Sequence, residues 1–227
     1  MLSLVLAALF FVGIHVCIAG TGLRDALVAR LGENAFRGLF SVLSFVGLIW
    51  LTTAYAGAPY TPLWGELYAL KPLVLLVTFV AFLLAVLGLT TPSPTAVGGE
   101  GTLDADEPAR GILRVTRHPF LAGVALWAAA HLVVNGEASA LVLFGSLLVL
   151  ALVGPASIDR KRRRAFGERW TRFEAVTSRV PFGAILRGRN RFVASELRPG
   201  MLALALIVWA VLLVLHPLLF GVVPWPG

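Results

Sequence analysis

The charged residues of this 227-residue chain are distributed so unevenly that six long windows contain none. Each window offers roughly the 17 to 25 apolar residues that one α-helix needs to cross a hydrocarbon core about 30 Å thick. Every window is long enough for one crossing and too short for two. The pattern predicts an all-α integral membrane protein, a six-transmembrane helical bundle forming a single membrane domain over residues 1–227. The windows are residues 1–23, 38–65, 72–99, 118–136, 138–158 and 199–227.

The Lys and Arg residues set the orientation of the predicted bundle. If the six windows cross the membrane in turn, only Lys71 of the 19 Lys and Arg residues falls on one side, and all the others fall together on the opposite side. Connections rich in Lys and Arg stay in the cytoplasm, which places both termini outside. This topology accounts for the formal net charge of +7, so we expect the lipid bilayer, and no nucleic acid, as the partner.

Two of the cytoplasmic connections combine basic and apolar residues at near-helical spacing. Residues 24–37 are predicted to form a cytoplasmic interfacial helix, and so is the basic segment after the fifth window, where Phe166, Trp170 and Phe173 form one stripe. We expect the apolar side of these helices to meet the membrane and their basic residues to attract anionic lipid headgroups. Residues 91–117, with several Pro and Gly residues and then an acidic stretch, are predicted to be a flexible cytoplasmic loop.

Histidines inside the predicted spans are candidate functional groups, because burying an ionisable side chain without a partner is costly. Counting about 1.5 Å of rise per residue, His15 lies roughly 18 Å from the outer end of the first span, and His131 lies roughly 18 Å from the inner end of the fourth. The two imidazoles should therefore lie at similar depths near the middle of the membrane. His118 and His216 fall near the two interfaces instead.

Two imidazoles at one depth suit a metal centre, and neutral imidazole is a common ligand of haem iron. Their neighbours are small or apolar, no carboxylate lies at that depth, and the single cysteine, Cys17, excludes a cysteine-built zinc site. We therefore favour haem b over zinc, with His15 and His131 as iron ligands and Asn135 as a polar neighbour. The alternative is that the two histidines hydrogen-bond to neighbouring helices and that Asn135 is a packing contact between helices.

Three groups of segments resemble the NnrU family, and together they span nearly the whole chain in the family's order. They are RHPFLAGVALW with AHLVVNG within 117–136, GIH with LVARLG and FRGLFS within 13–41, and IDRKR with FG, WTRF and TS within 158–178. The resemblance implies a multi-pass protein of the bacterial inner (cytoplasmic) membrane, with both termini periplasmic. It also implies an association with nitrite and nitric oxide reduction in denitrification, and hence a small nitrogen-oxide substrate.

The 15-cis-zeta-carotene isomerases look like relatives of this family, and they are haem b enzymes with histidine ligands. By the family's pattern those ligands fall on His15 and His131, the pair chosen above from depth. The resemblance therefore implies an alternative function, a haem-dependent cis–trans isomerase that acts on a small apolar polyene such as zeta-carotene.

A more distant likeness is to the isoprenylcysteine and phospholipid methyltransferases of membranes, through the Arg-His-Pro run at 117–119 and the Phe-Gly pair at 166–167. It implies a further alternative, S-adenosylmethionine-dependent methyl transfer at the cytoplasmic face through Arg117, His118 and Asp159. The acidic pair of those enzymes is absent, because Arg160 follows Asp159. A non-enzymatic assembly or sensor protein also fits the sequence.

The cytoplasmic rim is where we expect the two propionates of a haem between the first and fourth spans. Carboxylates in hydrocarbon are costly unless they pair with guanidinium groups. Arg117 enters the fourth span at this rim, so we expect it to bind a propionate. The alternative is an arginine that sets the topology and is hydrated among the headgroups.

Overall fold

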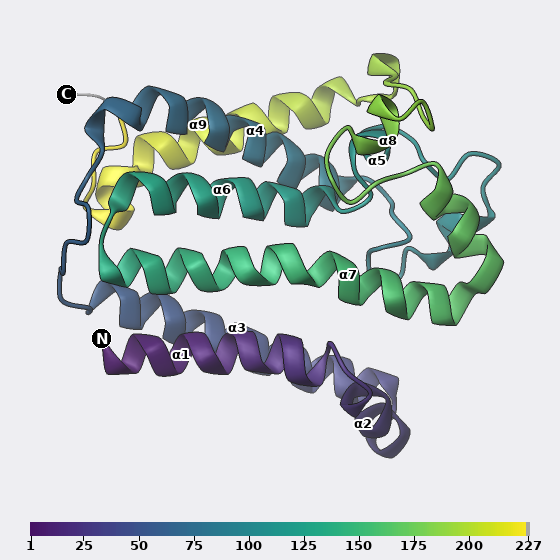
Figure 1. The fold of residues 1–227 in the computed structure, drawn as a ribbon, viewed down its shortest axis with the longest axis horizontal. Coiled ribbons are helices and arrows are strands. Elements are labelled where there is room, and N and C mark those ends of the chain that lie inside the picture. The colour runs from purple at the N-terminus through teal and green to yellow at the C-terminus, as the bar shows by residue number, and fades with distance from the viewer. Residues whose placement is uncertain (226–227) are drawn as a thin grey trace. The chain divides into compact units, whose positions relative to one another are not determined.

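The computed structural model describes residues 1–225, and the regular structure of that range is helical apart from one β-bridge that pairs Pro62 with Glu137 (Figure 1). The all-α prediction is therefore confirmed. The last two residues of the predicted sixth window, 226 and 227, lie outside the described residues.

Several helices are long and apolar enough to cross a membrane. Among residues 1–225, four meet this condition singly, and a fifth candidate is the pair Leu2–Ile18 and Leu23–Leu31, bent by 80°. Pro119–Asn135 is apolar but has 17 residues, which is short for a span. In the four long helices only 6 to 22% of each apolar window is buried inside the protein, so most of these side chains are left to contact lipid. The four are Glu33–Ala56, Tyr68–Thr90, Ala138–Val176 and Pro199–Phe220.

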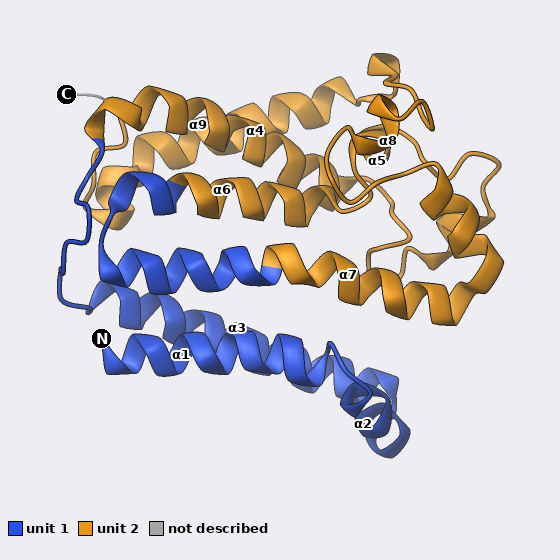
Figure 2. Cartoon of the chain, viewed as in Figure 1, with its two compact units in different colours: residues 1–67, 131–150 blue, residues 68–130, 151–227 orange. Residues whose placement is uncertain are grey.

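The chain divides into two compact units that are not consecutive in sequence (Figure 2). Unit 1 contains residues 1–67 and 131–150, and unit 2 contains residues 68–130 and 151–227. The divisions fall within α6 (Pro119–Asn135) and α7 (Ala138–Ala175), so each unit takes part of both helices.

Unit 1 begins with α1 (Leu2–Gly13), which runs directly into the π-helical turn η1 (Ile14–Ile18) and packs against α3 (Glu33–Ala56). The helices approach closely at Gly47, where an added Cβ would lie 3.0 Å from the Phe10 ring. Trp50 on α3 donates a hydrogen bond from Nε1 to the Ser3 hydroxyl at 3.1 Å.

The predicted interfacial helix over residues 24–37 is in fact interrupted. It consists of α2 (Leu23–Leu31) and the first turn of α3, and these are separated by Gly32 with φ of 82°. That conformation suits glycine and ends a right-handed helix. Arg24 on α2 binds Glu33 on α3 at 2.6 Å, so an ion pair spans the break.

A glycine turn closes the other end of unit 1. The amides of Leu63, Trp64 and Gly65 all lie within 2.8 to 3.1 Å of the Gly136 carbonyl oxygen. Gly136 has φ of 43°, and a Cβ there would meet the Gly65 carbonyl oxygen at 2.0 Å. Only glycine allows this approach, which fixes the loop before η2 beside the end of α6.

Unit 2 contains η2 (Tyr68–Leu70), α4 (Lys71–Thr90) and α9 (Pro199–Phe220), and α4 packs along α9. Trp209 of α9 donates a hydrogen bond to the Thr78 hydroxyl at 3.2 Å, which satisfies an indole N–H within an apolar helix pair. α6 also approaches α4 closely, because a Cβ at Gly123 would lie 2.5 Å from the Ala81 carbonyl oxygen.

The segment between α4 and α6 is packed, contrary to the prediction of a flexible loop. It contains η3 (Glu100–Asp104) and α5 (Ile112–Val115), and its residues Leu103, Ala109 and Leu113 are buried against Trp170 and Phe173. Trp170 and Phe173 of the aromatic stripe after the fifth window are therefore fully buried against protein, and Phe166 packs beside them as a partly buried residue. The physical reason is that the loop supplies its own apolar side chains to cover the stripe, and α7 changes direction at Gly167, whose φ is 52°.

Arg114 ties this packed segment to the residues before α9. Its buried guanidinium binds both oxygens of Glu196, each at 2.7 Å, and the side chains of Glu107 and Asn190 at 2.5 and 2.8 Å. Hydrogen bonds from Arg114 lower the pKa of Glu196 to about 2. Unit 2 is completed by α8 (Gly183–Leu186) and η4 (Ala194–Glu196).

Candidate functional site

His15 lies on the π-helical turn η1, just before the bend between Leu2–Ile18 and Leu23–Leu31. Such turns are rare and occur frequently at functional sites. The Nδ1 atom lies 2.7 Å from the Phe11 carbonyl oxygen, so Nδ1 carries the proton and donates it. This hydrogen bond leaves the lone pair on Nε2 and fixes the ring, as outer partners of metal-binding histidines do. The ring is held between Phe11 and Phe40, at centroid distances of 4.6 and 5.2 Å.

His131 lies in the last two turns of α6 and stacks on Phe144 of α7, with a centroid distance of 4.8 Å and an interplanar angle of 28°. Phe144 contacts Tyr55 of α3 edge-on at 6.1 Å, and the Tyr55 hydroxyl donates to the Glu137 carboxylate at 3.2 Å. A tyrosine and a carboxylate therefore belong to the surroundings of His131. Glu137 was not among the candidate residues predicted from the sequence.

Both histidines belong to unit 1. Their aromatic neighbours on α3, Phe40 for His15 and Tyr55 through Phe144 for His131, are separated by about 22 Å of helix. His15 thus lies beside the first third of α3, whereas His131 is linked through Phe144 to the last turn of that helix. The similar depth expected for the two rings stays a prediction.

The donor set fits a porphyrin better than a bare ion. Among residues 1–225, no three His, Cys, Asp or Glu side chains gather closely enough to hold a metal ion. A haem needs only two axial ligands from the protein, because the macrocycle supplies the other four. Asn135 is the last residue of α6 and is half-buried. His216 is turned to its own chain end, with Nδ1 2.8 Å from the Val222 carbonyl oxygen.

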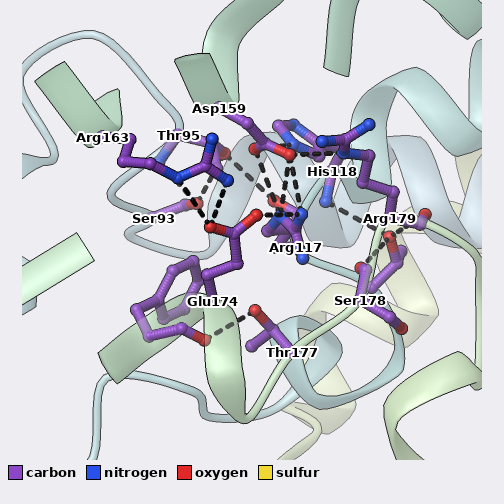
Figure 3. Close-up of polar contacts among 12 residues, drawn as sticks. Ser93, Thr95, Arg117, His118, Asp159, Arg163, Glu174, Thr177, Ser178 and Arg179 are labelled. Atoms are coloured by element: carbon purple, nitrogen blue, oxygen red, sulfur yellow. Dashed lines mark hydrogen bonds and ion pairs between the residues drawn. The ribbon is translucent and has the colours of Figure 1, made fainter. Parts of the chain in front are cut away.

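A second polar site lies in unit 2, around a fully buried carboxylate, Asp159 of α7 (Figure 3). His118 lies 2.8 Å from Asp159 Oδ1 through Nε2, and Arg117 binds Oδ2 through Nη2 at 2.7 Å. Arg179 donates to the same Oδ2 at 2.5 Å, and Glu174 accepts from Arg117 Nη2 at 3.1 Å. We call these five residues the Asp159 cluster.

Extended backbone before α6 positions this cluster. Thr116 has φ of −155°, its hydroxyl donates to the Arg179 carbonyl oxygen at 2.7 Å, and the Arg117 amide donates to the Ser178 carbonyl oxygen at 2.9 Å. The chain before α6 and the chain after α7 are thus hydrogen-bonded side by side. Pro119 then begins α6, where its missing N–H costs nothing.

The cluster brings together Arg117, His118 and Asp159, the three residues singled out for methyl transfer. Its chemistry, however, is that of a closed structural ion pair. The acceptor positions of Asp159 are occupied by two guanidinium groups and an imidazole, which leaves none to act as a base toward a substrate. Burial lowers the pKa of His118, so the ring stays neutral and donates its Nε2 proton to Asp159.

Arg117 is engaged by Asp159 and Glu174, two carboxylates of the protein itself. Its predicted role as a propionate partner stays a prediction. Glu174 and Arg179 were not anticipated from the sequence.

Residues 3–224 match the sequence model of the family described as "NnrU protein". The chain belongs to the NnrU family. Among curated proteins it is similar to 15-cis-zeta-carotene isomerase, chloroplastic, of Arabidopsis thaliana, with 27% identity over 198 residues, and of Zea mays, with 26% over 192 residues. Each alignment covers 83% of this chain and 51% of the relative, so the NnrU-family chain spans about half the length of these relatives. No solved structure matches it.

Proposed function

We propose that this NnrU-family protein is a membrane haem b protein in which His15 and His131 are the axial ligands. The observation that carries the proposal is the state of His15: it lies on a π-helical turn, and the Phe11 carbonyl oxygen fixes Nδ1 so that Nε2 holds the lone pair. The stacking of His131 on Phe144 in the same unit supports the second ligand.

The membrane topology that accompanies this proposal has six spans and both termini in the periplasm of a bacterium. The bent pair α1–η1 with α2 would cross once and return along the inner interface. α6 has 17 residues and about 25 Å of rise, and would be a short span, the fourth along the chain. The distribution of Lys and Arg supports the orientation.

The reaction we favour is the cis–trans isomerisation of a polyene. The support is the similarity to proteins named 15-cis-zeta-carotene isomerase over 83% of this chain. Isomerisation changes the geometry of a double bond and neither adds nor removes atoms, so the protein needs no co-substrate or general acid–base pair. The helices expose apolar faces that would contact the bilayer, and an apolar polyene would reach the site from there.

Membership of the NnrU family favours a second candidate, a role in nitrogen-oxide respiration with a small nitrogen-oxide ligand. The two functions differ in what the protein must bind. A polyene needs a long apolar groove reached from lipid, whereas nitric oxide needs no groove and would have to replace one of the two histidines at the iron.

A product assay distinguishes the isomerase from the role in nitrogen-oxide respiration. Purified protein in lipid nanodiscs would be given 15-cis-zeta-carotene, and the products separated by chromatography, with His216→Ala as a histidine control outside the site. A product in which the 15-cis double bond has become trans would support the isomerase, if the wild type and the control form it and His15→Ala does not. No product, together with a spectral change on adding nitric oxide, would favour the second candidate and overturn the first.

A further inference from the structure

A cavity of about 500 Å³ opens beside the Asp159 cluster, and every residue that lines it belongs to unit 2. Four arginines contribute to its wall: Arg117, Arg179, Arg187 and Arg189. Glu174 is the only carboxylate among the lining residues. The histidines of the proposed haem site do not line it, so the cavity is a separate feature of the protein.

The cavity carries an excess of positive charge. Glu174 is already bound by Arg117 and by Arg163, and Asp159 is shared by Arg117, His118 and Arg179. In the part of the chain that the structure describes, neither Arg187 nor Arg189 pairs with a carboxylate, and both are exposed. Arg189 donates from Nη1 to the Ala175 carbonyl oxygen at 2.6 Å, which neutralises no charge, so two exposed guanidinium groups keep an uncompensated positive charge that attracts an anion.

Arg117 provides a donor at the floor of the cavity. Its side chain is 95% buried, and Nε and Nη2 are bonded to Asp159 and Glu174 (Figure 3). The remaining nitrogen, Nη1, has no hydrogen-bond partner within residues 1–225, although the residue lines the cavity. Nη1 is not among the buried side-chain atoms that lack a partner, so it is accessible, and an anion in the cavity could accept its hydrogen bond.

Apolar side chains continue the wall beside these arginines. Val180 is 70% exposed and Leu186 is 83% exposed, so these two lining residues give the cavity an apolar edge. A buried guanidinium, two exposed guanidinium groups and an apolar edge together match a phosphate group that is attached to an apolar chain.

We propose that this cavity is a binding site for a phosphate group, contacted by Arg117, Arg187 and Arg189, with the apolar part of the ligand along Val180 and Leu186. The phosphate could come from an anionic phospholipid headgroup or from a free phosphate ion, and the chemistry of recognition is the same. This site goes beyond a diffuse attraction of basic residues to the membrane surface, because it predicts that particular arginines matter and that equally exposed ones do not.

The test uses the full chain in a neutral detergent and native mass spectrometry with phosphatidic acid. Arg187→Gln/Arg189→Gln should bind phosphatidic acid about tenfold more weakly or worse, since charge-assisted hydrogen bonds are lost. The matched control, Arg160→Gln/Arg164→Gln, removes the same charge from two exposed arginines outside the cavity and should bind as the wild type does. Melting temperatures of both double variants verify folding.

Two further ligands identify the source of the phosphate. Diacylglycerol, which lacks phosphate, should not bind, and inorganic phosphate should compete with phosphatidic acid if the ion alone is enough. Failure of inorganic phosphate to compete would assign the site to a lipid. Equal weakening of phosphatidic acid binding in both double variants, or binding of diacylglycerol as tight as that of phosphatidic acid, would overturn the proposal.

Discussion

Replacing Asp159 by alanine should be among the most destabilising single changes in unit 2. Asp159 is fully buried and its carboxylate is bonded to Arg117, His118 and Arg179. Removing one member of a buried ion pair costs about 3 to 5 kcal/mol, because the remaining charge is left without compensation. Arg117 keeps Glu174, and the Arg179 side chain is 45% exposed and can turn to solvent, so we expect the lower end, about 3 kcal/mol.

Thermal unfolding in detergent measures this loss. For a chain of this length about 3 kcal/mol corresponds to a fall of roughly 6 to 12 °C in Tm. Asp159→Asn keeps the shape and one acceptor oxygen, so its Tm should lie between those of the wild type and Asp159→Ala. Glu168→Ala is the control, because the Glu168–Arg172 pair is exposed on both sides and its removal should leave the Tm nearly unchanged. A Tm for Asp159→Ala equal to that of the control would show that the Asp159 cluster does not stabilise the fold.

Three further predictions follow from packing, titration and topology. Gly123→Ala should lower the Tm, because its Cβ would lie 2.5 Å from the Ala81 carbonyl oxygen. The control Gly145→Ala, whose Cβ would meet nothing within 4 Å, should leave the Tm unchanged or raise it. Equal effects of the two substitutions would show that α6 and α4 are not in close contact. Burial lowers the pKa of His118, so the unfolded chain takes up a proton near pH 6.5 that the folded protein does not, and stability should fall as the pH is lowered from about 7.5 to about 5. His118→Gln should weaken this dependence in pH-dependent melting curves, and an unchanged slope would exclude His118 as its source. A reporter fused to the C-terminus should be periplasmic and one inserted near Gly101 cytoplasmic, and the reverse pattern would overturn the topology.

The membrane character of the fold could be predicted from charge alone, because a charged side chain is costly in hydrocarbon wherever it lies on the helix. The boundaries between packed segments and flexible loops could not be predicted, because they depend on side-chain packing. Residues 91–117 contain the Pro, Gly and acidic residues of a flexible loop, yet Leu103 and Leu113 cover Trp170 and Phe173 in the folded protein. Nothing in the local pattern of either segment indicates its partner, which lies more than 50 residues away.

The histidines show the same limit at the candidate site. The depth of His15 could be predicted from the helix rise. The π-helical turn that holds His15 and the hydrogen bond to the Phe11 carbonyl oxygen could not, because they depend on backbone geometry that a run of apolar residues does not reveal. The Asp159 cluster was only partly foreseen, since Arg117, His118 and Asp159 were linked by a distant likeness, while Glu174 and Arg179 were not. Long-range ion pairs need the fold before their partners can be named.

Haem ligation is the central claim, and one spectrum tests it most directly. The chain would be produced with haem available and purified, and the reduced-minus-oxidised spectrum recorded for the wild type, His15→Ala, His131→Ala and the control His216→Ala. The account predicts a haem b spectrum in the wild type and the control, and loss or a large change of that spectrum in each of the other two, because an axial ligand is removed. A wild-type protein that takes up no haem, or a spectrum that survives both substitutions unchanged, would contradict it.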